Sequence, residues 1–143
     1  LNNLKKVFYI DKTERVVATD VFQNQIDTMR NKFHKYQYFD ACVLDILDDD
    51  LGKYKNAFDT VICINVLEHL SDDYRAVKNM VSLLQWGGVL RADGSSVATA
   101  IFDLDKNVGH YRRYDPGRLE ALQGRMFENH KASLLQYAGD YTL

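Results

Sequence analysis

The chain has little of several features whose scarcity excludes whole classes of protein. Among its 143 residues there are two cysteines and one proline, so neither a disulfide scaffold nor a proline-rich linker fits the composition. No apolar run approaches the roughly 20 residues that a membrane-spanning helix needs. The formal net charge is only −2, which argues against a general nucleic-acid binder.

The cysteines and the N-terminal residues favour the same compartment. Cys42 and Cys63 both lie in apolar, strand-like runs, so we expect reduced core thiols rather than a disulfide or a reactive pair. Residues 1–6 are polar and basic and show no signal peptide. We therefore expect a cytoplasmic protein. Hydrophobic residues make up 46% of the chain, enough for the core of a single domain over residues 1–143.

The clearest structural signal is a nearly unbroken apolar run over residues 58–64, which ends in Asn65, Glu68 and His69. Such a run predicts a strand buried on both faces, as in a parallel sheet covered by helices. In open sheets of this kind, ligands bind beyond the carboxyl ends of the strands. The stretch therefore predicts both a fold class and the place of a site.

Strands and helices alternate along the rest of the chain. We expect strands at 16–19, at 39–44, from residue 89 and at 132–137, and helices at about 22–35 and after residues 71 and 115. This order predicts an α/β fold with a doubly wound, mostly parallel sheet and helices on both faces.

The helix after residue 71 can be predicted in more detail. Ser71 is the expected cap, and glycines 87 and 88 are the expected stop. The residues expected on its buried face are Tyr74, Val77, Met80, Val81 and Leu84.

Three predicted strands end in polar residues, namely Asp20, Asp45 and Asn65. The ends of parallel strands line one edge of a sheet. A carboxylate after the second strand of a nucleotide-binding half commonly accepts hydrogen bonds from ribose hydroxyls, which suits Asp20, and Asp45 could accept from an exocyclic amine such as that of adenine. Either aspartate could instead be an ordinary helix cap or loop residue.

In these and further segments, the chain resembles the class I S-adenosylmethionine-dependent methyltransferases of the small-molecule type, whose fold is Rossmann-like. The resemblance runs from about residue 14 to about residue 127. The segments that carry it are 16–20, 45–46, 58–69, 83–90 and 105–114, the last containing His110-Tyr111-Arg112-Arg113-Tyr114.

The resemblance implies a role for each residue at the strand ends. Asp20 would bind the ribose diol of S-adenosylmethionine, and Val21 would pack near the adenine. Asp45 and Ile46 would recognise the adenine edge, by side chain and by backbone. Asn65 would line the methionine part of the cofactor.

One departure from the family concerns the N-terminus. The family's Gly-x-Gly-x-Gly cofactor loop is not in this sequence, and residues 1–13 resemble the remains of the helix after that loop. We expect the sheet to lack its first strand in this chain, either because the domain is N-terminally incomplete or because the protein is a degenerate member. A strand at residues 7–10 would instead form a hairpin with the next strand, since the connection is too short for a parallel crossover.

Two histidines are candidate catalytic bases, because histidine titrates near neutral pH. His69 follows the strand at 58–64, but it could simply cap or pack the following turn. The resemblance places His110 in a loop over the acceptor, although it could be an ordinary surface histidine.

A local basic cluster follows His110 in a chain of negative net charge. Arg112 and Arg113 could hold an anionic acceptor, because arginine binds carboxylate or phosphate with two hydrogen bonds, or they could pair with acidic neighbours. Tyr111 could form a wall of the acceptor pocket or serve in packing. The histidines and cysteines show no zinc spacing, so we expect no metal.

The sequence therefore predicts methyl transfer from S-adenosylmethionine to a small, possibly anionic acceptor by direct displacement. The alternative is a catalytically silent methyltransferase-like domain that binds a partner protein. A nicotinamide dehydrogenase is a third candidate, but it would need the missing glycine loop. We expect neither a nucleic acid nor a membrane as partner, and exposed strand edges would favour homo-oligomers.

Overall fold

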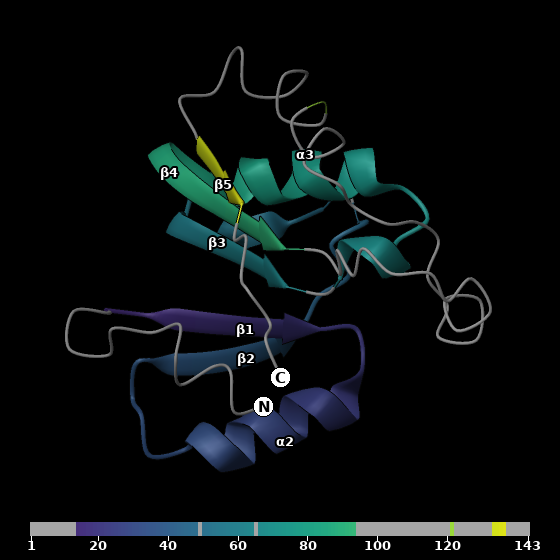
Figure 1. Ribbon diagram of the computed structural model, residues 1–143. Coiled ribbons are helices and arrows are strands. Elements are labelled where there is room, and N and C mark those ends of the chain that lie inside the picture. The colour runs from purple at the N-terminus through teal and green to yellow at the C-terminus, as the bar shows by residue number, and fades with distance from the viewer. Residues whose placement is uncertain (1–13, 49, 65, 94–120, 122–132, 137–143) are drawn as a thin grey trace, which may run out of the picture. The chain divides into compact units, whose positions relative to one another are not determined.

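The computed structural model describes residues 14–48, 50–64, 66–93, 121 and 133–136, which are coloured in Figure 1. The chain divides into two compact units, Leu1–Asp45 and Ile46–Leu143. Each unit is described by itself below. Among the described residues, no helix has both the length and the apolar character needed to cross a membrane.

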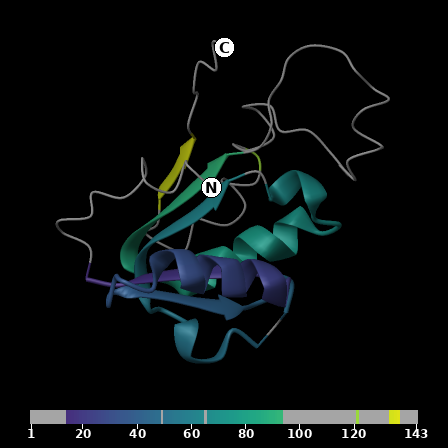
Figure 2. The same ribbon diagram turned by 90° about the horizontal axis from the view of Figure 1, so that it is seen from below.

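The first unit is a strand–helix–strand motif made of β1 (Val16–Asp20), α2 (Gln23–Phe33) and β2 (Phe39–Val43). The two strands run parallel, and α2 lies across one face of the pair (Figure 2). Ile26 of α2 and Ala41 of β2 are fully buried.

Two further contacts hold α2 to the strand that follows it. The Arg30 guanidinium donates from Nε and Nη2 to the Ala41 carbonyl, at 3.0 and 2.6 Å. The ring of Phe33, the last residue of α2, lies 4.7 Å from the ring of Phe39, the first residue of β2, between centroids. A polar bond and a ring contact therefore supplement a small aliphatic core.

The second unit is a three-stranded sheet with one helix among its described residues. Its elements are η2 (Gly52–Tyr54), β3 (Phe58–Ile64), η3 (Leu67–His69), α3 (Asp73–Leu83), β4 (Leu84–Asp93) and β5 (Ser133–Gln136). The strand order is β3-β4-β5, and both pairs are parallel. α3 covers one face of this sheet, and the core between them contains Leu67, Val77 and Leu90 (Figure 1).

The structure confirms the α/β class and the parallel pairing predicted from the sequence. The described strands form two sheets, β1-β2 and β3-β4-β5. A single doubly wound sheet therefore stays a prediction. The segment at residues 1–13 and nearly all of the helix expected after residue 115 lie outside the described residues. The missing first strand and the single domain therefore stay predictions.

The expected burial of β3 on both faces is wrong. Cys63 is buried and Val61 packs against the same core, on the side of α3. Ile62 and Ile64, which alternate with them, are 36% and 41% exposed. Successive side chains of a strand point to opposite faces, and among the described elements of this unit only α3 covers a face.

The expected start and buried face of α3 also need correction. The cap is Asp72, not Ser71, because its carboxylate accepts a hydrogen bond of 2.9 Å from the Arg75 backbone N–H. Tyr74 is 45% exposed, so it lies outside the buried stripe. Val77, Met80 and Val81 are buried as predicted.

The two glycines do not stop α3. The helix ends at Leu83, and β4 begins at once with Leu84, which pairs with Phe58. The register then shifts, because Thr60 pairs with Val89, so β4 bulges through the glycines. Gly87 has a φ of +82°, and a Cβ on Gly88 would lie 3.0 Å from the Asp59 carbonyl oxygen. Both positions therefore suit glycine for reasons of the strand, not of the helix.

Candidate functional site

In the first unit, the ends of β1 and β2 bring two of the predicted site residues to the same place. Asp20 is the register partner of Val43, and the Leu44 backbone N–H donates to the Asp20 carbonyl at 3.1 Å. Asp20 is the last residue of β1, and Asp45 lies two residues beyond the end of β2. The backbones of both aspartates therefore lie at the same end of the strand pair, within one unit.

The turn after β1 orients the Asp20 side chain. Its Oδ1 accepts a hydrogen bond of 2.9 Å from the Phe22 backbone N–H, as aspartates do where a chain turns into a helix. Val21 and Phe22 are 51% and 65% exposed. The carboxylate thus stands beside two exposed apolar side chains, a combination that suits a ligand with a polar diol and a flat apolar ring.

In the second unit, Ile46 begins a turn that α3 fixes. The Asn79 Nδ2 donates to the carbonyl oxygens of Ile46 and Asp48, at 2.7 and 2.8 Å. Ile46 and Leu47 also pack against the core of the unit. The backbone that the sequence assigns to the adenine edge is therefore held by a buried side chain.

His69 lies at the end of η3 and is exposed, and its backbone N–H donates to the Val66 carbonyl at 2.9 Å. The histidine thus closes a short turn after β3, and its exposed position is also compatible with a catalytic base. The role of His69 as a catalytic base stays a prediction.

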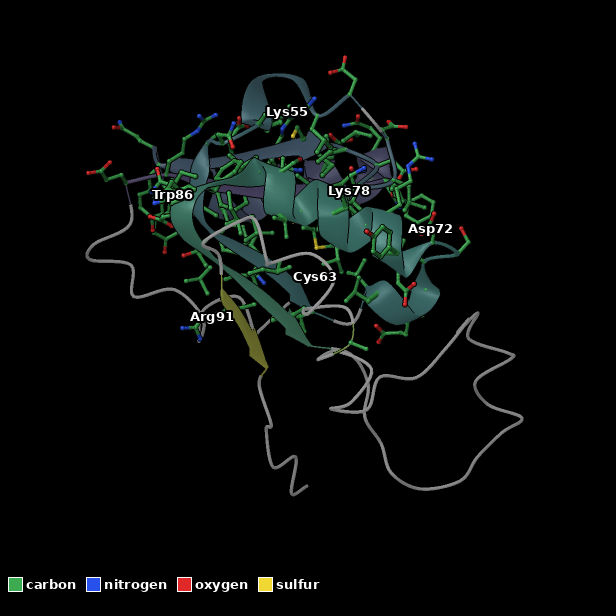
Figure 3. The ribbon with its side chains drawn as sticks, turned by 90° about the horizontal axis from the view of Figure 1, so that it is seen from above. Lys55, Cys63, Asp72, Lys78, Trp86 and Arg91 are labelled. Atoms are coloured by element: carbon green, nitrogen blue, oxygen red, sulfur yellow. The ribbon has the colours of Figure 1, made fainter. Side chains whose placement is uncertain are left out.

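The neighbouring residue Glu68 is almost fully buried, at 1% exposure, near the buried Cys63 in this unit. Burial, together with the nearby Glu68 charge, raises the pKa of the Cys63 thiol to about 12, although a backbone hydrogen bond at Leu67 opposes the shift. Figure 3 shows Cys63 below α3. Cys63 is therefore a protonated core thiol at neutral pH, as the sequence predicted, and it is not a nucleophile.

The remaining candidates lie outside the described residues, so their roles stay predictions. They are Asn65, His110, Tyr111, Arg112 and Arg113. Within the part of the chain that the structure describes, no three acidic, histidine or cysteine side chains are grouped to hold a metal ion.

Sequence reasoning did not anticipate the burial of Glu68 and Asn79. Glu68 belongs to the motif that follows β3, but nothing in its spacing shows that it is buried. Asn79 could have been noticed, because it lies one turn after Ala76 and directly before Met80 on the apolar side of α3. A polar residue inside an apolar stripe usually has a partner to satisfy it.

The family of the chain follows from its similarity to known proteins. Residues 2–90 match the model of a family described as a methyltransferase domain. The chain belongs to this family. The match confirms the methyltransferase family that the sequence predicted.

Solved structures of similar fold include two methyltransferases and one further protein. The trans-methyltransferase CalH in complex with S-adenosylhomocysteine is 32% identical, with a TM-score of 0.50 over 53% of this chain and 22% of its own. The CurJ carbon methyltransferase is 26% identical, with a TM-score of 0.50 over 53% of this chain and 21% of its own. The YcgJ protein from Bacillus subtilis is 15% identical, with a TM-score of 0.59 over 78% of this chain and 51% of its own.

The chain thus spans between about a fifth and a half of the length of these structures. Among curated proteins, none matches the sequence. The family is therefore established by the family model, whereas the methyl acceptor and the residues that act on it belong to the proposal below.

Proposed function

We propose that this chain binds S-adenosylmethionine beyond the carboxyl ends of its strands and contributes to methyl transfer onto a small, anionic acceptor. The observation that carries the proposal is the placement of Asp20 and Asp45 at the same end of β1 and β2. Two carboxylates there supply acceptors for a ribose diol and for an adenine amino group. Membership of the methyltransferase-domain family supports the same ligand.

The residues at the strand ends fit this cofactor chemically. Asp20 has a fixed orientation, because Phe22 holds one of its oxygens, and Val21 offers an exposed apolar surface for the adenine ring. Asp45 would accept from the adenine amino group, and the Ile46 backbone would complete recognition of that edge. Asn65 would line the methionine part.

The bound cofactor supplies a methyl group that its positive sulfur already activates. Transfer of this group to the acceptor would be a direct displacement. The protein mainly has to align the acceptor and exclude water, and positioning of this kind can contribute about 7–11 kcal/mol. His69 and His110 would remove a proton where the acceptor is a hydroxyl or a protonated amine.

The acceptor's charge would be matched by Arg112 and Arg113, with Tyr111 as a wall of the pocket. Guanidinium groups form paired hydrogen bonds with a carboxylate or a phosphate. An Arg112→Ala, Arg113→Ala double variant should raise the KM for an anionic acceptor and leave S-adenosylhomocysteine binding unchanged. An unchanged KM would exclude this part of the proposal.

The first experiment is a calorimetric titration of the chain with S-adenosylhomocysteine, after its mass and folding have been verified. We expect micromolar binding, weakened about 10- to 100-fold in Asp20→Asn because a charged hydrogen bond to the diol is lost. Asp27→Asn is the matched control, since Asp27 is an exposed aspartate of the same unit that accepts one bond from Gln23.

A folded wild-type chain that binds no S-adenosylhomocysteine would contradict the proposal. That result would favour the alternative of a silent domain that binds a partner protein. Equal losses in Asp20→Asn and Asp27→Asn would remove Asp20 from the site but leave the cofactor in place.

A further inference from the structure

We propose that Asn79 is a positioning residue for adenine recognition, which acts by holding the backbone of the Ile46–Asp48 turn. The inference rests on the proposed function, because it takes Ile46 as part of the cofactor site. Asn79 itself lies on α3 and is expected to touch no part of the cofactor. Its effect on the ligand would pass entirely through the turn.

The contacts of Asn79 fix two points of the turn at once. One nitrogen, Nδ2, donates to the Ile46 carbonyl at 2.7 Å and to the Asp48 carbonyl at 2.8 Å. An amide NH₂ has two hydrogens in a fixed plane, so both donors are used and their directions are set together. The side chain is only 8% exposed, which strengthens both bonds and makes their loss costly.

α3 is a firm support for this side chain. The helix is capped by Asp72, and both Ala76, one turn before Asn79, and Met80, directly after it, are buried in the core. Ile46 and Leu47 lie in a turn beyond the end of β2, outside either sheet. Since sheet pairing does not hold the turn, the Asn79 amide and the packing of the two side chains hold it instead.

Recognition of adenine by a backbone depends on this kind of support. Adenine presents a ring-nitrogen acceptor beside an amino donor, and hypoxanthine presents the reverse pattern, an N–H donor beside a carbonyl acceptor. A site that pairs a backbone N–H with a carboxylate therefore prefers adenine only while the two groups keep their spacing. A loosened turn would lower the affinity for adenine more than that for hypoxanthine, so the preference itself would shrink.

The experiment compares two ligands, S-adenosylhomocysteine and S-inosylhomocysteine, by calorimetry on the full chain. We expect the wild type to prefer the adenosyl ligand by about tenfold or more, and Asn79→Ala to reduce this ratio to about threefold or less. A merely structural role would weaken both ligands by the same factor and leave the ratio unchanged. Asn79→Ser keeps one donor and should fall between them, which serves if the alanine variant fails to fold.

Ser82→Ala is the matched control. Ser82 lies on the same helix, one turn further on, and its Oγ donates to the Asn79 carbonyl at 2.7 Å. The variant removes a similar hydrogen bond without reaching the turn, so the ligand ratio should stay at the wild-type value.

The outcomes separate the inference from the proposed function. Wild-type selectivity that survives in both Asn79 variants would overturn the role of Asn79 and leave the cofactor proposal intact. A wild-type chain that binds neither ligand would overturn the proposed function, and the role of Asn79 with it.

Discussion

The two units contain the same local arrangement, a strand, an 11-residue helix and a parallel strand, yet they bury very different shares of that helix. In α2 only Ile26 is buried, whereas α3 buries seven residues, including Val77, Met80 and Val81. Two units with the same connectivity can therefore have cores of very different size. Because burial of apolar side chains is the main favourable term in folding, the second unit should be the more stable one.

The helix ends show the same contrast. α3 begins with a capping aspartate and an acidic first turn, while the residue that caps α2 is Phe22, which makes no side-chain bond to the helix. The unit that we expect to be less stable is therefore the one that carries Asp20 and Asp45. Regions that order around a ligand are commonly the less stable parts of a protein, so a bound cofactor should stabilise the first unit most.

Core truncations give the largest expected effect and test this contrast directly. Leu90→Ala and Ile26→Ala each remove a fully buried aliphatic side chain and should cost about 2–5 kcal/mol. Native-state hydrogen exchange should show the loss from Leu90→Ala in amides of the second unit, and the loss from Ile26→Ala only in those of the first. Equal losses in both units for either variant would mean that the two units unfold together. The difference in buried core would then give no difference in their free energies of unfolding.

The next largest effect is a dependence of the unfolding free energy on pH, which comes from Cys63 in the second unit. Since burial raises the pKa of Cys63 to about 12, the folded state keeps the proton that the unfolded chain releases above pH 9. This stability is present below pH 9 and is lost as the pH rises toward 12. Between pH 8 and 10 the wild type should lose about 1.4 kcal/mol more than Cys63→Ala, measured by urea denaturation. Parallel pH profiles would refute the raised pKa.

How far the sequence predicts the structure differs between elements. β1 and β3 were predictable because runs of β-branched and apolar residues end sharply at polar ones. The burial of Tyr74 was predicted wrongly, because helical spacing does not show where an apolar stripe ends. The glycines at 87 and 88 were misassigned as a helix stop, because only the pairing of Leu84 with Phe58 shows that the strand has already begun.

The candidate site likewise contains residues that the sequence predicts and residues that it does not. The placement of Asp20 and Asp45 at one end of β1 and β2 was predictable, because the carboxyl ends of parallel strands share an edge, which needs only the element order. The apolar stripe around Asn79 indicates that its amide has a partner, but the identity of the partners, Ile46 and Asp48, was not predictable, because they lie more than 30 residues earlier in the chain. Long-range polar contacts of this kind depend on packing that a single sequence does not display.

Removal of the cap of α3 should have a moderate effect. Asp72→Ala deletes the acceptor of the Arg75 N–H bond and should lower the free energy of unfolding by about 0.5–2 kcal/mol. Ser71→Ala is the control, because Ser71 precedes the capping residue and should cost little. Chemical denaturation followed by circular dichroism measures both, and a larger loss from Ser71→Ala would restore the sequence-based assignment of the cap.

The smallest effect should come from giving α2 the cap that α3 already has. Phe22 has the extended backbone of a capping residue, with φ −102° and ψ 121°, and its ring is largely exposed, so Phe22→Ser sacrifices little burial. The serine hydroxyl can accept from the first turn of the helix, and we expect a gain of about 0.5–1 kcal/mol in the unfolding free energy of the first unit, read by hydrogen exchange. Val21→Ser, one residue earlier, lacks the capping position and should give no gain. If the two substitutions act alike, the missing cap does not explain why the first unit is weaker, and the cause must lie in its small core.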